Sequence, residues 1–172
     1  MGQEPNRHVM YRQYLKVEDT KTGKGTFTTV PIPPNSMIVE MTGPIVLDRN
    51  LPADSSVYLQ IGPNSYMGPS GGETPEFLNH SCDPNCKVHI VGNRAFLYSL
   101  YLIPANNQLT FDYSTTSTET LDMWQMQCKC GAFKCRKVIS GASYLSPEQL
   151  HNYQVKGMLP LYITDPGILQ KK

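Results

Sequence analysis

Turn-forming residues interrupt this sequence at short intervals. The 172 residues include 14 prolines and 13 glycines, which recur along the whole chain. Together they make up about 16% of it, against an average usage of about 12%. The apolar and β-branched runs between them are therefore short and predict small sheets rather than alternating strands and helices. We expect a mainly β fold with few helices, with strands near residues 10–17, 26–30, 37–41, 57–61, 87–91, 95–100 and 108–113.

Length and charge restrict the class of protein. A chain of 172 residues predicts one compact domain, and 40% hydrophobic residues against 17% charged residues are sufficient for a core. With 15 Lys and Arg against 14 Asp and Glu, the chain is not a strongly basic scaffold, and we expect no direct nucleic-acid binding. Its apolar runs fall short of the roughly 18 residues that a membrane helix needs, and no signal-peptide stretch is visible. We expect an intracellular protein, cytoplasmic or nuclear, without a membrane partner.

One helix has a clear start signal. Ser146 at the N-cap, Pro147 at the first helical position and Gln149 at N3 form a capping box. Leu145 and Leu150 have the spacing of a hydrophobic staple. The predicted helix ends near residue 157, and the apolar residues after it predict a docked tail. The polar run 114–120, in contrast, predicts an exposed connection.

Three cysteines lie close together near the end of the chain. Cys128, Cys130 and Cys135 fall within eight residues, and the total of five cysteines without a secretory signal argues against a disulfide framework. Unligated clustered thiols would be an oxidation hazard, so a metal site is the better interpretation. Tetrahedral zinc needs a fourth ligand, for which Cys82 and Cys86 are the candidates.

The segment 79–86 is dense in polar and thiol side chains. Its composition alone favours a strand end followed by an Asx/Pro turn. His80 and Cys82 could also form a nucleophile pair, but they are two residues apart and the metal requires a thiol here. A thiol hydrolase is therefore the less favoured interpretation.

Three motifs resemble those of SET-domain methyltransferases, in the order of that family. Residues 77–85 (FLNHSCDPN) resemble the motif around N-H-S-C, and residues 109–113 (LTFDY) resemble the second motif. The three-cysteine run resembles the post-SET zinc loop, which takes its fourth ligand from the cysteine of N-H-S-C, here Cys82. Weaker similarity extends the resemblance to about residues 21–135.

This resemblance implies a SET fold of the β-clip type. Such a fold has several small curved antiparallel sheets, few short helices and a pseudoknot, in which the segment at Asn79 passes beneath a loop. It also implies a division into an N-terminal strand or extension (1–20), a SET domain (21–114), a post-SET zinc loop (115–140) and a short C-terminal helix with a docked tail (141–172).

The resemblance also implies a cofactor site for S-adenosyl-methionine. Lys24, Gly25 and Phe27 match positions that line the cofactor. Backbone groups of Asn79 and His80 would hold its adenine, with the Asn79 side chain near its amino-acid end. Many family members have arginine where this chain has Glu76, so we expect less positive charge on the cofactor side.

The substrate side follows from the same resemblance. Tyr113 matches the catalytic tyrosine, and Phe111 the position that tunes how many methyl groups fit. Met41 replaces a tyrosine of the lysine channel and would line a wider apolar pocket. Methyl transfer is an in-line displacement from a sulfonium to a neutral amine, which a narrow, dry channel favours.

Three functions remain open from the sequence. The first is S-adenosyl-methionine-dependent methylation of a lysine on a protein, a histone among the candidates, with a structural zinc at Cys82, Cys128, Cys130 and Cys135. The second is a small-molecule enzyme that uses the same pocket, as Met41 suggests. The third is a non-catalytic, zinc-stapled binding module. Fold analogy does not separate them, because function lies in the site.

Overall fold

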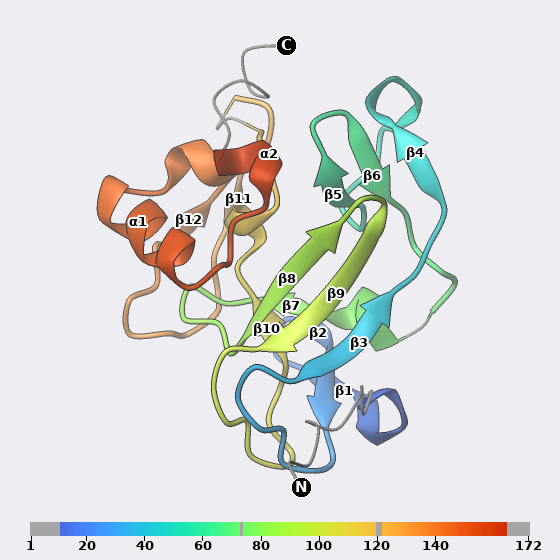
Figure 1. Cartoon of the computed structure of the whole chain (residues 1–172), viewed down its shortest axis with the longest axis vertical. Coiled ribbons are helices and arrows are strands. Elements are labelled where there is room, and N and C mark those ends of the chain that lie inside the picture. The colour runs from blue at the N-terminus through green and yellow to red at the C-terminus, as the bar shows by residue number, and fades with distance from the viewer. Residues whose placement is uncertain (1–10, 73, 120–121, 165–172) are drawn as a thin grey trace, which may run out of the picture.

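Small sheets dominate the computed structural model, which describes residues 11–72, 74–119 and 122–164 (Figure 1). Within these ranges the strands form two three-stranded and three two-stranded sheets, and the helices are short. The mainly β fold expected from the frequent turns is confirmed. The threaded pseudoknot stays a prediction.

Three antiparallel sheets make up most of the fold. The largest has the order β3-β9-β8, and its strands supply much of the hydrophobic core. A second three-stranded sheet has the order β4-β6-β5, and an N-terminal hairpin joins β1 to β2. The strands are β1 (Leu15–Thr20), β2 (Gly23–Thr28), β3 (Met37–Met41), β4 (Ile45–Leu47), β5 (Leu59–Gly62), β6 (Ser65–Met67), β8 (Cys86–Val91) and β9 (Arg94–Ser99).

Two short pairs complete the β structure. β7 (Asn79–His80) runs parallel to β10 (Thr110–Phe111), which makes this pair an exception to the expected antiparallel pairing. β11 (Met126–Gln127) pairs antiparallel with β12 (Val138–Ile139). These four two-residue strands are too short to produce a recognisable alternation of apolar and polar residues, so only β10 fell within a predicted strand.

The predicted strands differ from the observed ones mainly at their ends. The strand predicted over 37–41 is confirmed at both ends. The one predicted over 10–17 begins only at Leu15, because a 3₁₀ turn occupies Arg12–Tyr14; residue 10 lies outside the described residues. The one predicted over 108–113 is only two residues long, because Tyr113 starts another 3₁₀ turn.

The C-terminal segment packs around its own small core. α1 (Pro147–Val155) begins with the predicted capping box at Ser146, and Gly157 follows it with a φ of 60°. α2 (Leu161–Thr164) follows. Both helices lie on the same side of the molecule as β11 and β12 (Figure 1). The cluster contains Ala142, Leu145, Tyr153 and Met158, with Leu150, Leu159 and Ile163 packed against it. Of the apolar tail residues, only Leu161 is exposed within the described part of the tail.

The expected exposure of residues 114–120 is wrong for the start of that run. Ser114, Thr115 and Thr116 are all buried, because their hydroxyl groups find acceptors inside the fold. The Ser114 hydroxyl donates to the main-chain oxygen of Ser140 at 2.6 Å, and the Thr115 hydroxyl to that of Asp112 at 2.7 Å. Residue 120 lies outside the described part.

None of the helices in the described ranges is long and apolar enough to cross a membrane.

Candidate active site and metal-binding cluster

The parallel pair of β7 and β10 brings two distant sequence motifs together. Asn79 is opposite Thr110 and His80 is opposite Phe111. The pairing continues at Ser81, whose amide donates to the main-chain oxygen of Phe111 at 3.1 Å. Tyr113 therefore emerges directly beside the segment that carries Asn79 and His80.

Tyr113 is held at both ends. Its hydroxyl donates to the main-chain oxygen of Leu78 at 2.7 Å, and its amide donates to Nδ1 of His80 at 3.2 Å. The rings of Phe111 and Tyr113 pack with their centroids 4.9 Å apart. Burial raises the pKa of Tyr113 to about 12, so its hydroxyl is neutral at physiological pH.

Two cavities meet at Tyr113. The first has a volume of about 410 Å³ and the second about 300 Å³, both in the size range of ligand pockets. Among the described residues, Tyr113 is the one that lines both. Ligands in the two cavities could thus both reach this tyrosine.

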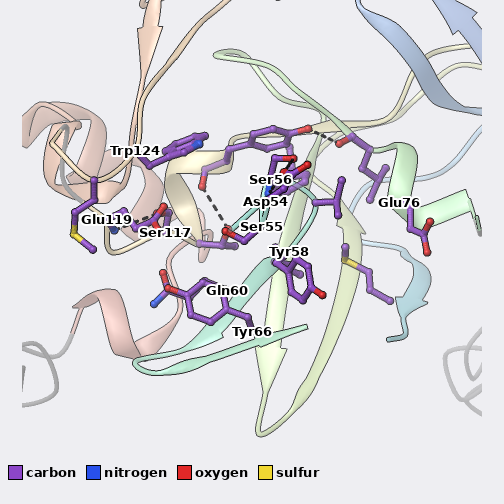
Figure 2. A pocket seen from close by; sticks show the side chains of 18 of the residues that line it. Asp54, Ser55, Ser56, Tyr58, Gln60, Tyr66, Glu76, Ser117, Glu119 and Trp124 are labelled. Atoms are coloured by element: carbon purple, nitrogen blue, oxygen red, sulfur yellow. Dashed lines mark hydrogen bonds between the residues drawn. The ribbon is translucent and has the colours of Figure 1, made fainter. Parts of the chain in front are cut away.

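The first cavity is acidic and aromatic (Figure 2). Tyr58, Tyr66 and Trp124 provide aromatic walls, and burial raises the pKa of Tyr66 to about 12. No Lys or Arg occurs among the described residues around it. Its carboxylates belong to Asp54, Glu76 and Glu119, and the predicted substrate-side residues Met41 and Phe111 line it as well.

Glu76 does not lie where the sequence suggested. It lines the first cavity and not the one beside Asn79 and His80. Its carboxylate accepts hydrogen bonds from the amide and hydroxyl of Ser70, and from the amide of Gly72 at 2.8 Å. Glu76 thus anchors the glycine-containing loop beside it, a role that its position before the motif did not reveal.

The second cavity contains part of the predicted cofactor set. Asn79 and His80 line it, together with Tyr113. Cys128 and Cys130, predicted as metal ligands, also line it. The remaining lining residues lie in a turn and in the segment before and between these cysteines, and no sequence pattern marked them for this cavity. They are Lys21, Thr22, Met126, Gln127 and Lys129.

Three predicted cofactor residues, Lys24, Gly25 and Phe27, do not line this cavity. The main-chain oxygen of Lys24 accepts a hydrogen bond from Nδ2 of Asn79 at 2.9 Å. Gly25 leaves room for that amide, because a Cβ there would lie 3.1 Å from Nδ2 and 2.4 Å from Nε2 of Gln108. Phe27 pairs within the β1–β2 hairpin and does not reach the cavity.

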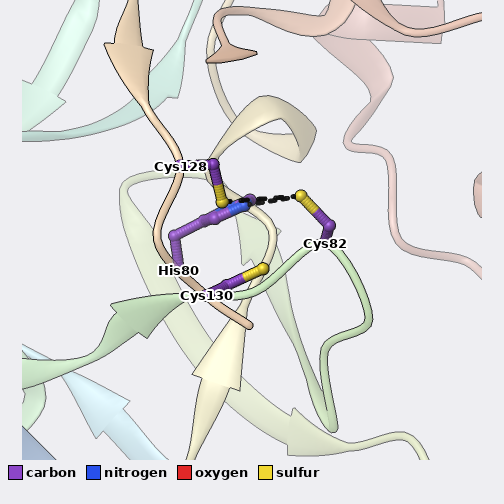
Figure 3. Close-up of side chains that lie close together, drawn as sticks. All are labelled: His80, Cys82, Cys128 and Cys130. Carbon is purple, nitrogen blue, oxygen red and sulfur yellow. Dashed lines mark hydrogen bonds between the residues drawn. The ribbon is translucent and has the colours of Figure 1, made fainter. Parts of the chain in front are cut away.

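Metal-ligating side chains converge next to the second cavity (Figure 3). The ligand atoms of His80, Cys82, Cys128 and Cys130 all lie within 4.8 Å of one another. The sulfurs of Cys82 and Cys128 are 3.7 Å apart, close to the roughly 3.8 Å that separates two thiolates on a tetrahedral zinc. The predicted ligand Cys135 lies outside this group, in which His80 stands instead. Its sulfur is 3.9 Å from the main-chain oxygen of Cys128, and its thiol interacts with those of Cys128 and Cys130.

Cys82, and not Cys86, joins the cluster. Cys86 is fully buried in the main core, where its thiol faces Oδ1 of Asn85 at 3.3 Å. All five cysteines are free thiols. Burial raises the pKa of Cys82 to about 11 and also raises that of Cys128, whereas, despite burial, hydrogen bonds lower the pKa of Cys130 to about 7. A bound cation would therefore be needed to ionise Cys82 and Cys128 at neutral pH. The donor set fits zinc.

A buried ion pair connects the loop that carries Cys128, Cys130 and Cys135, here called the cysteine loop, to Asp112, which lies between β10 and Tyr113. Asp112 is fully buried and accepts from Nη1 and Nη2 of Arg136 at 2.6 and 2.7 Å. It also accepts from the Tyr153 hydroxyl at 2.7 Å and from the Ser114 amide at 3.1 Å. The Ser114 contact is local, but Arg136 and Tyr153 lie 24 and 41 residues away, so no local pattern could have predicted those two partners.

The comparisons with known proteins agree with this arrangement. A family model described as the SET domain matches residues 23–114, just over half of the chain. The chain is 31% identical over 127 residues to a histone-lysine N-methyltransferase, H3 lysine-4 specific, of Eremothecium gossypii. This alignment covers 65% of this chain and 13% of that protein. The chain is 26% identical over 145 residues to the histone-lysine N-methyltransferase trithorax of Drosophila virilis, which covers 76% of this chain and 4% of the relative.

Solved structures share the fold. The KRYPTONITE structure in complex with mCHG DNA and SAH has a TM-score of 0.62 at 27% identity, over 72% of this chain and 28% of that one. The KRYPTONITE structure in complex with mCHH DNA, an H3(1–15) peptide and SAH has a TM-score of 0.61 at 26% identity. The match covers 73% of this chain and 29% of that one. This chain thus spans only a small part of these curated relatives and solved proteins. The match over residues 23–114 shows that the chain belongs to the SET domain family.

Proposed function

We propose that this chain transfers a methyl group from S-adenosyl-methionine to the side-chain amine of a lysine in a protein. The observation that carries the proposal is the meeting of two oppositely charged cavities at Tyr113. The relatives named above as histone-lysine N-methyltransferases, and the solved neighbours bound to SAH and to an H3 peptide, support the same reaction.

The second cavity is the proposed cofactor site. S-adenosyl-methionine, when bound, supplies a methyl group on a sulfonium. Its carboxylate suits the two cationic residues Lys21 and Lys129, and Asn79 and His80 line the remaining wall. The hydrogen bond from Asn79 to the main chain of Lys24 fixes this wall against the β1–β2 hairpin.

The first cavity is the proposed substrate site. Its carboxylates attract a cationic side chain, and a substrate packed against its aromatic walls would displace water from them. Exclusion of water favours the neutral form of a lysine amine, which is the nucleophile. The Tyr113 hydroxyl, whose proton is held by Leu78, presents its oxygen to orient that amine.

The cysteine cluster is the proposed zinc site. Cys82, Cys128, Cys130 and Cys135 would hold the ion, which has a structural role. It would fix residues 126–130 as one wall of the cofactor cavity. We assign residues 21–114 to the catalytic domain, 115–140 to the zinc loop and 141–172 to its C-terminal support. A histone substrate would place the activity in the nucleus.

The test is the variant Tyr113→Phe. We expect it to reduce methyl transfer from labelled S-adenosyl-methionine to a histone pool by about 10²-fold, because one group that orients the transition state is lost. Calorimetry should give an unchanged affinity for S-adenosyl-methionine. Tyr144→Phe, at a partly exposed tyrosine outside both cavities, is the matched control.

Two outcomes would contradict the proposal. Failure of the wild-type chain to bind S-adenosyl-methionine would remove the cofactor site. Binding together with label transfer to free small amines, and none to proteins or peptides, would favour a small-molecule enzyme.

A further inference from the structure

The His80 ring lies between the metal-binding cluster and Tyr113. Nδ1 is 3.2 Å from the Tyr113 amide nitrogen, which donates to it, and Nε2 is 3.3 Å from the Cys82 sulfur. The side chain is 5% exposed, so water does not compete for either contact. One imidazole thus contacts both a candidate zinc ligand and the main chain of the candidate catalytic residue.

The hydrogen bond from Tyr113 determines the role of the other ring nitrogen. Oδ1 of Asp112 also lies 3.5 Å from Nδ1, but that carboxylate already accepts from Arg136, Tyr153 and Ser114, and the Tyr113 amide is the nearer partner. A nitrogen that accepts an N–H carries no proton of its own, so we assign the proton of the neutral ring to Nε2. Nε2–H then points at Cys82 and donates to its sulfur. A ring that ligated a metal through Nε2 while Nδ1 accepted this bond would have no proton on either nitrogen. His80 therefore fits as a donor to a zinc ligand and not as the ligand itself.

Arg136 provides a second connection between Cys82 and the segment that carries Tyr113. Its main-chain amide donates to the Cys82 sulfur at 3.4 Å, and its guanidinium makes the paired bonds to Asp112. Asp112 immediately precedes Tyr113, and Arg136 immediately follows Cys135. Both connections begin at the sulfur of Cys82 and end on the dipeptide Asp112-Tyr113.

We propose that His80 is a positioning residue, which couples the geometry of the metal site to Tyr113, with Arg136 as a parallel connection. The same rigid ring donates from Nε2–H to the Cys82 thiolate and accepts from the Tyr113 amide, so a shift at one contact moves the other. Loading of the metal site thereby fixes the position of Tyr113 between the two cavities. The role of Tyr113 in this statement rests on the proposed function; the contacts of His80 do not.

The first test measures the ring itself in the zinc-loaded full chain. A long-range ¹H–¹⁵N correlation spectrum reports which nitrogen of each histidine carries the proton, and we expect Nε2–H for His80. In the cadmium-113 form, couplings should reach cysteine protons and no imidazole proton. A proton on Nδ1, or a cadmium coupling to the His80 ring, would make His80 a ligand and overturn the proposal.

The second test separates the two contacts of His80. His80→Asn can still accept from the Tyr113 amide but cannot reach Cys82, whereas His80→Gln can reach Cys82. We expect His80→Asn to weaken zinc binding about 10–100-fold in chelator competition, and to shift the Tyr113 amide cross-peak. His80→Gln should retain more zinc affinity than His80→Asn. The exposed His151→Asn is the control.

The outcomes distinguish this proposal from the proposed function. Zinc affinity and the Tyr113 amide signal are measured without any methyl transfer, so an inactive wild-type chain would refute the function and leave this test standing. Where transfer is observed, kcat should fall in His80→Asn with KM for the peptide unchanged. Unchanged zinc affinity and an unmoved Tyr113 signal in a folded His80→Asn would overturn the coupling.

Discussion

At the scale of single residues, the burial of Tyr113 determines its protonation state. A tyrosine in water titrates near pH 10, and burial moves the pKa of Tyr113 to about 12. The hydroxyl therefore keeps its proton, and its bond to Leu78, throughout the range in which a lysine amine loses its own proton. Ionisation of the substrate, and not of Tyr113, should govern the dependence of the rate on pH.

We predict a one-sided pH–rate profile. The rate of methyl transfer should rise with pH as the fraction of neutral lysine grows, with no descending limb below about pH 11. The measurement is kcat/KM against pH, with folding checked by circular dichroism at each value. A descending limb near pH 10 in the folded protein would show that Tyr113 titrates as an ordinary tyrosine.

At the scale of elements, the cysteine loop and the C-terminal helix share one buried carboxylate. Asp112 accepts from Arg136 of the loop and from Tyr153 of α1. A carboxylate with no exposed surface requires such partners, because desolvation of an unpaired charge is costly. The ion pair therefore holds these elements to the segment that ends in Tyr113.

Removal of the buried guanidinium of Arg136 should strongly destabilise the folded protein. Arg136→Met leaves the Asp112 carboxylate buried without a counter-ion and should lower the free energy of unfolding by about 3–5 kcal/mol. The matched control is Arg94→Met, which removes a similar paired contact with Glu40 on the surface and should change stability little. Chemical denaturation measures both variants. Equal effects of the two substitutions would contradict the role of burial.

The second C-terminal helix supports the first cavity. The Tyr162 hydroxyl of α2 has one proton to share between the main-chain oxygens of Thr116 at 2.7 Å and Gln60 at 2.9 Å, and both of these residues line that cavity. Gln60 also accepts from the Thr118 amide at 2.8 Å, which ties β5 to the segment after Tyr113. The tail thus holds two walls of the proposed substrate site together.

Tyr162→Phe tests this support. Loss of the hydroxyl removes the one proton that the two buried carbonyl oxygens share, and should lower the free energy of unfolding by about 1–3 kcal/mol. We also expect a higher KM for a peptide substrate with little change in the affinity for S-adenosyl-methionine. Tyr144→Phe is the control here as well. A change confined to cofactor affinity would contradict the assignment of Tyr162 to the first cavity.

At the scale of the whole molecule, the metal cluster joins parts of the chain that are far apart in sequence. Cys82 follows β7, whereas Cys128 and Cys130 follow β11. A metal bound between them would close a long loop, and its binding free energy would contribute to folding. The same loop forms one wall of the second cavity.

Removal of the metal should therefore abolish cofactor binding before it unfolds the main core. We expect chelation to lower the melting temperature and to eliminate the calorimetric signal with S-adenosyl-methionine, while the β3-β9-β8 sheet keeps its protected amides in hydrogen exchange. Readdition of zinc should restore binding. Unchanged cofactor affinity in metal-free protein would contradict this coupling.

Local sequence patterns determined much of what this molecule contains. The turn residues bounded the strands, Ser146 and Gln149 specified the start of α1, and the spacing of Cys128, Cys130 and Cys135 indicated a metal site. These features depend on residues a few positions apart, so they are visible in the sequence. The resemblance to the SET family added Tyr113 and the choice of Cys82.

Only the tertiary structure decided how these pieces combine. It buried residues 114–116, moved Glu76 to the first cavity, and placed Lys21 and Lys129 in the second. It also paired Asp112 with Arg136 and aimed His80 at Cys82. Each of these outcomes depends on contacts between segments separated by many residues, and such contacts form only when burial of one segment satisfies the charge or hydrogen bonds of another.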